Sequence, residues 1–333
     1  MHPISTVPSD NSGRVLRVDR GQCDVMTEAG VRRAVWRAVD LSGATVCVGD
    51  EVQLTPTGEL PTVSAIAPRR SAITRIDSAP GSSVHQVLAA NVDIAAICEP
   101  CHPTPTLARV ERLLALAWES GARPVVILTK ADLADDLEST VADVEALVLG
   151  VPLLTVVATT GEGLEAVRAL IGPGDTIALL GRSGAGKSTL LNALVGESVM
   201  QTSRLRADGR GRHTTTHRQM LPLPNGSFII DTPGVKGVGI ASPDGLEQVF
   251  ADVERLAGDC KFNDCSHTVE PGCAVLEAVD DGVLLQRRLD SYRKLQREAA
   301  YQARRTDARL AAAERARWKS IHKELRRSQT PRP

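Results

Sequence analysis

The chain has 333 residues and a formal net charge of −1, and 42% of its residues are hydrophobic, 24% charged and 2% aromatic. This length exceeds what one hydrophobic core usually supports, so we expect roughly two or three domains. No apolar run approaches the roughly 18 residues that a membrane span requires, which excludes an integral membrane protein. Residues 1–13 are polar and rich in turn formers, without the apolar stretch of an export signal, and predict a disordered leader in a cytoplasmic protein.

Residues 14–72 alternate apolar and polar positions in short stretches such as RVLRV, CDVM and ATVCVGDEVQL. Gly, Asp and Pro interrupt these stretches. The pattern predicts a small β-barrel, and it contains no catalytic constellation.

From about Asn91 the pattern changes to buried strands that alternate with helices. The segments are NVDIAAIC, TLARVERLLALAW, PVVILT, PLLTVVA, DTIALL and STLLNALV. Strands and helices in this alternation predict a parallel sheet covered by helices, which we assign to residues 73–241. Near its end, Pro224, Asn225 and Gly226 separate two apolar runs and predict a hairpin turn.

A phosphate-binding loop follows the apolar strand Ile177 to Leu180 and precedes a helical run, in the pattern G-x4-G-K-[ST]. Glycines let the backbone wrap around a phosphate, and the helix N-terminus attracts negative charge. Lys187 would neutralise the β- and γ-phosphates, and the Ser188 hydroxyl would bind Mg²⁺. The nucleotide-binding residues predicted here are Gly181, Arg182, Ser183, Gly184, Ala185, Gly186, Lys187, Ser188 and Thr189.

The loop alone does not separate GTP from ATP, and Thr129-Lys130-Ala131-Asp132 at the end of PVVILT would select the base. The Asp132 carboxylate can accept hydrogen bonds from N1–H and the 2-amino group of guanine, which adenine lacks. The usual motif is Asn-Lys-x-Asp, so the Thr129 hydroxyl must brace the loop. Further along, Val157 replaces the Ser of a Ser-Ala loop, while Ala158 keeps the backbone donor for guanine O6.

Two further segments have the character of nucleotide switches. Asp231 ends the strand SFIID in the sequence Asp-Thr-Pro-Gly, where the carboxylate can hold Mg²⁺ through water and the Gly234 N–H can contact the γ-phosphate. Between the phosphate loop and Asp231 lies RGRHTTTH, whose Thr215 or Thr216 would bind Mg²⁺ and the γ-phosphate. The pattern does not choose between these two threonines.

The order of these motifs is unusual. In a conventional GTPase the phosphate loop comes first, but here the base-reading residues 129–132 precede Lys187. Chain ends in compact domains tend to lie close together, so a circular permutation preserves the sheet. The Asp231 switch then leads directly into the C-terminal domain, which we assign to residues 242–333.

Cys260, Cys265, His267 and Cys273 lie within 14 residues and supply three thiolates and one imidazole, a full tetrahedral set for one structural Zn²⁺. The spacing Cys98-x-x-Cys101 has no second pair, and we interpret it as incidental.

The C-terminal domain otherwise predicts a helix near Leu246 to Leu256 and one or two basic helices from about Val283. From Arg287 onward there are 15 Lys or Arg against 5 Asp or Glu. This tail fits either a nucleic-acid contact or a solvated helix.

The permuted motifs, the loop RHTTTH and the segment CKFNDCSHTVEPGC together resemble the ribosome small subunit-dependent GTPase A family, circularly permuted GTPases of the TRAFAC class. The resemblance covers nearly the whole chain. It implies an N-terminal OB-fold, a central permuted GTPase domain and a mostly helical C-terminal zinc domain. It further implies a monomer without membrane partners that binds GTP or GDP, the small ribosomal subunit and its rRNA, assists late maturation of that subunit, and is stimulated by it to hydrolyse GTP.

The catalytic residue stays open. Val235 stands where many GTPases carry the Gln that orients the attacking water, so we expect slow intrinsic hydrolysis. His213 is the candidate replacement, but it could instead contact RNA, or the subunit could supply the missing group. Rival functions are an RNA-binding scaffold with incidental turnover and an ATP-dependent kinase or transporter ATPase, and Asp132 argues against the latter.

Overall fold

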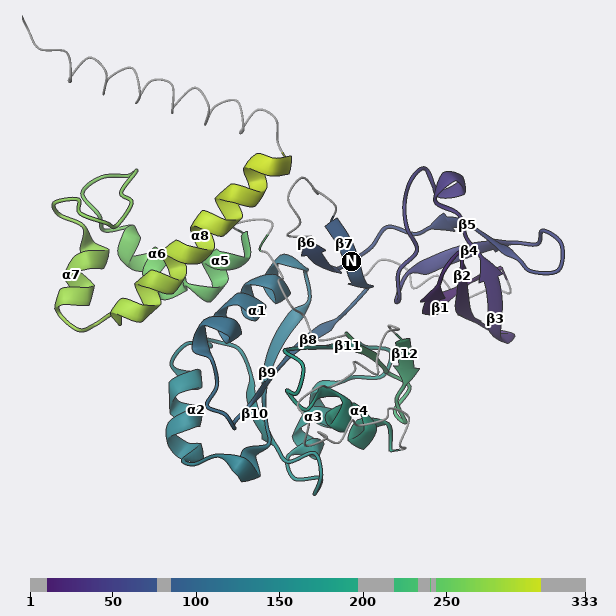
Figure 1. The fold of residues 1–333 in the computed structure, drawn as a ribbon, viewed down its shortest axis with the longest axis horizontal. Helices are drawn as coiled ribbons and strands as arrows, with labels where there is room; N and C mark the ends of the chain where they lie inside the picture. Colours follow the sequence, from purple (N-terminus) through teal and green to yellow (C-terminus); the bar gives the residue numbers. More distant parts are fainter. Residues whose placement is uncertain (1–10, 77–84, 197–218, 233–239, 241–243, 307–333) are drawn as a thin grey trace, which may run out of the picture. The chain divides into compact units, whose positions relative to one another are not determined.

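The computed structural model describes residues 11–76, 85–196, 219–232, 240 and 244–306 (Figure 1). The chain divides into two compact units, one of residues 1–75 and 86–238 and the other of residues 76–85 and 239–333. None of the helices in the described ranges is long and apolar enough to cross a membrane.

Five strands at the start of the first unit form a closed barrel. They are β1 (Ser12–Asp19), β2 (Gln22–Thr27), β3 (Gly30–Val35), β4 (Glu51–Thr55) and β5 (Thr62–Ile66), with the short 3-10 helix η1 (Ala38–Leu41) after β3. The strand order is β1-β2-β3-β5-β4, and β1 also pairs with β4, which closes the ring. Alternate residues such as Val15, Val25 and Val63 fill its core. The predicted barrel is confirmed, and its order is that of an OB-fold.

The rest of the first unit is a sheet of mostly parallel strands. Its strands are β8 (Ile94–Pro100), β9 (Arg123–Thr129), β10 (Leu153–Val156), β11 (Thr176–Leu180), β12 (Gln219–Pro222) and β13 (Phe228–Asp231). The order is β10-β9-β8-β11-β13-β12, in which only β12 is antiparallel to its neighbour within this group. The carboxyl ends of the five parallel strands therefore share one edge, where such sheets bind ligands.

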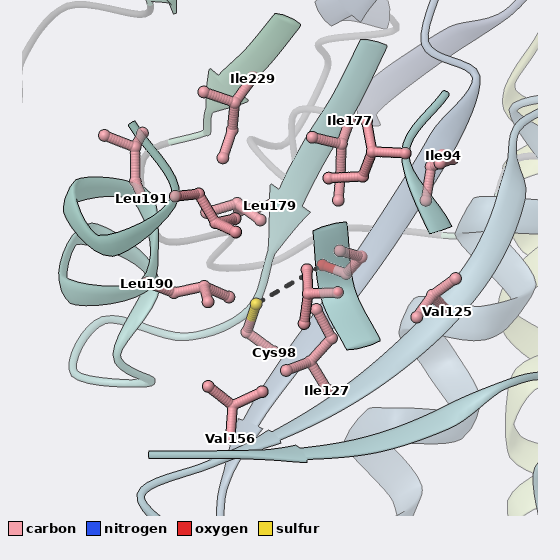
Figure 2. Packing of buried hydrophobic residues seen from close by; sticks show 14 of the residues in the cluster. Ile94, Cys98, Val125, Ile127, Val156, Ile177, Leu179, Leu190, Leu191 and Ile229 are labelled. Carbon is pink, nitrogen blue, oxygen red and sulfur yellow. Dashed lines mark hydrogen bonds between the residues drawn. The ribbon is translucent and has the colours of Figure 1, made fainter. Parts of the chain in front are cut away.

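The helices of this part are α1 (Leu107–Glu119), α2 (Leu137–Glu145), α3 (Leu164–Leu170) and α4 (Lys187–Val195), with the 3-10 helix η2 (Ala131–Leu133). Figure 2 shows apolar side chains of the sheet, among them Ile177, Leu179 and Ile127, packed toward Leu190 and Leu191 of α4. This buried layer fixes the strand ends that carry the predicted motifs.

The predicted hairpin is confirmed, since β12 and β13 pair antiparallel and Gly226 takes the left-handed φ of 80°. Two short strands that we did not predict, β6 (Ala72–Ile76) and β7 (His85–Ala90), form a separate small sheet.

The described part of the second unit is helical. It contains α5 (Asp244–Val249), α6 (Ala251–Ala257), α7 (Ala274–Asp280) and α8 (Gln286–Thr306), and α8 confirms the predicted basic helix. The single helix predicted near Leu246 to Leu256 is wrong, because the backbone leaves helical geometry at Phe250 (φ −109°, ψ 35°). Phe250 is fully buried, with the Tyr292 ring 5.3 Å away and the Arg288 guanidinium 4.3 Å from its centroid. The interruption between α5 and α6 thus coincides with the packing of Phe250 against α8.

Candidate functional site

The phosphate loop connects β11 to α4 and is shaped by its glycines. Gly181 has a φ of 146°, and a Cβ there would lie 2.3 Å from the carbonyl oxygen of Cys98. Gly186 has a φ of 80°, and a Cβ there would lie 3.2 Å from Thr129 Oγ1. Any side chain at either position would strain the loop and push it from the neighbouring strand ends.

Lys187 is oriented by the loop itself. Its Nζ donates hydrogen bonds to the carbonyl oxygens of Gly181 at 2.8 Å and Arg182 at 2.9 Å. An ammonium group has three donors, so one remains for a phosphate oxygen. Burial lowers the pKa of Lys187, while the nearby Cys98 and Asp231 act in the opposite direction. The two loop carbonyls therefore orient the ammonium group of Lys187.

Residues 129–132, the predicted base-reading segment, are hydrogen-bonded to the phosphate loop. Thr129 Oγ1 donates to the carbonyl oxygen of Ala185 at 2.8 Å, the hydroxyl contact expected in place of Asn. Lys130, in the left-handed region at φ 55°, donates from Nζ to the carbonyl oxygen of Gly184 at 2.9 Å. Two adjacent side chains at the end of β9 thus fix two adjacent carbonyls of the phosphate loop.

A cavity of about 190 Å³ lies between these segments. Its lining residues are Thr129, Lys130, Asp132, Leu133, Val157, Ala158, Thr159, Gly186 and Thr189. The predicted Thr129, Asp132 and Ala158 therefore meet in one hollow, although Ala158 lies in a different loop. Leu133 and Thr159 were missed by the sequence analysis, and the only available signal was their position next to predicted residues.

Asp231 lies at the end of β13 and pairs with Leu179 of β11 in the parallel register. Burial raises the pKa of its carboxyl group, and the Lys187 cation acts in the opposite direction. Thr232 donates from Oγ1 to the carbonyl oxygen of Leu179 at 2.5 Å and so fixes the chain just after Asp231. The structure thus brings Lys187 and Ser188, at the start of α4, and Asp231, at the end of β13, to one edge of the sheet.

The remaining predicted residues of this site are not all described. Arg182, Ser183 and Ser188 lie in the phosphate loop and the first turn of α4, and Ala131 begins η2. The positions outside the described residues are His213, Thr215, Thr216, Gly234 and Val235.

The second unit holds the predicted metal cluster. One ligand atom from each of Cys260, Cys265, His267 and Cys273 lies within 4.8 Å of the others. The Sγ atoms of Cys260 and Cys273 are 3.8 Å apart, and these atoms lie 3.6 and 3.4 Å from His267 Nδ1. Zn–S bonds of about 2.3 Å in a tetrahedron place two sulfurs about 3.8 Å apart. The donors fit a tetrahedral metal ion.

Local hydrogen bonds support this cluster. Burial opposes ionisation of Cys260, but the backbone N–H groups of Val275 and Ala274 overcome it and lower the pKa of the thiol. Glu270 accepts from the backbone N–H groups of Thr268 at 2.8 Å and Val269 at 3.0 Å. The cluster could therefore hold a metal ion through thiolate and imidazole ligands.

By contrast, Cys98 and Cys101 are buried free thiols, and burial raises the pKa of each. Cys98 lies in the core shown in Figure 2, where its Sγ contacts the carbonyl oxygen of Ala96 at 3.8 Å.

Known proteins resemble the chain in both sequence and fold. Residues 66–241 match the model of the RsgA GTPase family. A small ribosomal subunit biogenesis GTPase RsgA of Streptomyces avermitilis is 53% identical over 315 residues, which cover 92% of this chain and 85% of that protein. The crystal structure of YjeQ from Thermotoga maritima superposes with a TM-score of 0.65 at 27% identity, covering 87% of this chain and 98% of that one.

The crystal structure of YloQ, described as a circularly permuted GTPase, has a TM-score of 0.61 at 22% identity and covers 90% of this chain and 98% of that one. This likeness concerns the fold, and it agrees with a base-reading segment that precedes the phosphate loop. The predicted fold class is confirmed: an N-terminal five-stranded barrel, a permuted α/β nucleotide-binding fold and a helical C-terminal part with a Cys/His cluster. With both the geometry and the sequence in agreement, the chain belongs to the RsgA GTPase family and is a GTP hydrolase.

Proposed function

We propose that the protein binds the small ribosomal subunit, assists its late maturation, and couples subunit-stimulated GTP hydrolysis to its own release. The observation that carries the proposal is the bracing of the base-reading segment onto the phosphate loop by Thr129 and Lys130. A relative that is 53% identical is named a small ribosomal subunit biogenesis GTPase, and it extends the proposal to the partner. The protein acts as a cytoplasmic monomer with no membrane partner.

Residues 129–132, 158, 181–189 and 231 form what we call the nucleotide edge, and in this proposal they bind different parts of GTP. Asp132 accepts hydrogen bonds from guanine, the Ala158 N–H faces O6, and Lys130 lies along the base. The phosphate loop from Gly181 to Thr189 surrounds the phosphates, and Lys187 offers its remaining donor to them. The 190 Å³ cavity beside Asp132 supports this assignment of the base.

Oxygen ligands support a Mg²⁺ ion bound with GTP. Ser188 lies at the start of α4 beside Lys187, and Asp231 lies at the end of β13 near the Lys187 cation. Hydroxyl and carboxylate oxygens suit this ion. When bound, Mg²⁺ would neutralise charge on the phosphates. Thr215 or Thr216, with the Gly234 N–H, would complete the contacts of the γ-phosphate, and His213 is the proposed catalytic group.

The proposal assigns residues 14–72 and the basic C-terminal tail to rRNA contacts, residues 73–241 to nucleotide chemistry, and residues 242–333 to a zinc domain. Zn²⁺ is the proposed metal because three thiolates and one imidazole in a closed tetrahedron suit a structural zinc ion. Four protein ligands leave no open coordination position.

Turnover of GTP, measured with and without purified small subunits, tests the proposal. We expect slow hydrolysis alone, strong stimulation by small subunits, no stimulation by large subunits, and poor competition by ATP. Equal dissociation from the subunit with GTP and with a non-hydrolysable analogue would instead favour a scaffold whose turnover is incidental. Undiminished stimulated turnover in His213→Ala, with normal GTP binding, would remove the catalytic role of His213.

A further inference from the structure

Arg14 of β1 is a half-buried cation at the contact between the barrel and the parallel sheet. Its Nη2 donates to the carbonyl oxygen of Asn91 at 2.8 Å, and its guanidinium carbon lies 5.4 Å from the centroid of the Phe228 ring. Burial lowers the pKa of Arg14, while the charges of Asp93 and Glu51 favour its ionised form. One barrel side chain therefore contacts both the turn before β8 and the first residue of β13.

Asn91, which accepts the Arg14 hydrogen bond, is itself held in place by several contacts. It is buried and holds a left-handed φ of 52°, which Asn tolerates better than most residues. Its Nδ2 donates to the carbonyl oxygen of Gly49 at 3.0 Å, and its Oδ1 accepts from the backbone N–H of Arg70 at 2.9 Å. Asn91 thus joins the barrel, the segment that leaves the barrel, and the start of β8.

Backbone pairing extends the same contact. The N–H of Ala90 donates to the carbonyl oxygen of Val48 at 2.9 Å, and Arg17 of β1 pairs antiparallel with Gln219 of β12. The barrel and the sheet therefore share one continuous set of hydrogen-bonded strands. A displacement of β1 must move β12, or break this pairing.

Phe228 and Asp231 are the two ends of β13. A strand rises about 3.3 Å per residue, so the Arg14 contact and the Asp231 carboxylate lie roughly 10 Å apart along one stiff strand. β13 is also bonded to β11 throughout, from Thr176 opposite Phe228 to Leu179 opposite Asp231. A displacement of Phe228 would therefore displace Asp231 by a similar distance.

The Arg14 contact has an unused donor. Its Nε is buried and has no hydrogen-bond partner. A buried donor without a partner is unfavourable, so an arrangement that supplies an acceptor gains stability. The carboxylates whose charge acts on Arg14 are those of Asp93 and Glu51, and Asp93 already binds the Arg70 guanidinium at 3.0 Å and the N–H of Thr176 at 2.9 Å. A small shift of the barrel could bring the Asp93 carboxylate to Arg14 Nε in place of one of its present donors.

We propose that Arg14 is a positioning residue that transmits binding at the barrel through Phe228 and β13 to Asp231. The inference rests on the proposed stimulation of hydrolysis by the small subunit. It gives the barrel a role in activation beyond attachment, and it predicts that binding and stimulation can be separated by one substitution.

The test compares Arg14→Met, which keeps an unbranched apolar stem, with Arg33→Gln as the matched control. Arg33 lies in the same barrel, loses the same charge, and pairs with Asp19 at 2.6 Å and Asp24 at 2.8 Å. We expect Arg14→Met to keep basal turnover and subunit affinity within about twofold and to lose about tenfold or more of the stimulated kcat. Arg33→Gln should be stimulated normally. Normal stimulation of Arg14→Met at normal subunit affinity would overturn the inference.

Hydrogen exchange provides a readout that does not need the subunit. With GDP and with a non-hydrolysable GTP analogue, the β1 amides of the wild-type protein should exchange at different rates, and Arg14→Met should abolish the difference. Equal exchange of β1 in both states of the wild type would overturn the inference. If the subunit fails to stimulate the wild type, the proposed function fails and this exchange experiment decides the inference alone. If Arg14→Met does not fold, Arg14→Gln, which also removes the cation, takes its place with the same expected outcomes.

Discussion

The nucleotide edge and the metal loop, residues 260–273, differ in the contacts that stabilise them. At the nucleotide edge, the side chains of Thr129, Lys130 and Lys187 fix the phosphate loop through its own carbonyls, above a fully buried core. Among residues 260–273, by contrast, only His267 and Cys273 are buried, and both belong to the ligand cluster, while Phe262 and Val269 are exposed. Side-chain hydrogen bonds over a buried core therefore fix the first site, whereas the second depends on local hydrogen bonds and on its metal ligands.

Loss of a metal ligand should give the largest effect. Cys273, one of the four metal donors, directly precedes α7, and Cys273→Ser removes its thiolate. Structural zinc in small domains supplies about 10 kcal/mol or more of folding free energy. We expect residues 258–285 to lose amide protection and the protein to bind less than one zinc ion per chain. Hydrogen exchange with zinc titration measures both.

The control for that variant is the nucleotide edge itself. GTP affinity of Cys273→Ser should stay within about twofold, because the site's braces lie in the other unit. A large loss of GTP affinity would contradict the contrast between the two regions.

Lys187→Ala should follow in size. The change removes a buried cation that two loop carbonyls orient, and truncating a buried charged partner costs about 2–5 kcal/mol. We expect GTP affinity to fall about 100-fold or more, as measured with a fluorescent nucleotide. Retention of the zinc content would show that the loss is local, and unchanged affinity would refute the assigned role of Lys187.

Thr129→Val tests the brace between the two loops. Valine keeps the shape of the side chain but leaves the Ala185 carbonyl without its donor, at a cost of about 1–3 kcal/mol. GTP affinity should fall roughly 5- to 100-fold, while Thr129→Ser, which keeps the hydroxyl, should bind nearly as the wild type. Equal affinity of the two variants would exclude the hydroxyl as the brace.

Asp231→Asn should have the smallest effect on stability, and a positive one. Burial raises the pKa of Asp231 in the folded protein above its value in the unfolded chain. The folded protein therefore loses stability as the pH rises from the unfolded-state pKa through the folded-state pKa. Asparagine removes this penalty, and the Tm of the nucleotide-free protein at neutral pH should rise by about 2–4 °C. The gain should vanish below about pH 4, where both states of the wild type hold the proton. A gain that does not depend on pH would argue against this origin, and hydrolysis should be lost in either case.

The sequence by itself determined the local chemistry of both sites. The pattern of Gly181 to Ser188 between an apolar strand and a helical run defines a phosphate loop, because the glycine spacing and the flanking elements are all local. Four donors between Cys260 and Cys273 likewise define a metal set, since their spacing allows one short loop to surround an ion. The alternation of residues 14–72 was enough for a barrel.

Only the tertiary structure decided which distant residues meet. That Thr129 binds the carbonyl of Ala185, 56 positions later, depends on how β8, β9 and β11 are ordered in the sheet. The break at Phe250 depends on packing against Tyr292 and Arg288 of α8, which local helix propensity does not contain. The Arg14 contact was not predictable for the same reason, because an arginine in an alternating strand gives no sign that it will lie half-buried against Asn91 and Phe228. Chemistry carried by neighbours in sequence can be read directly, whereas contacts between distant segments require the sheet order that brings them together.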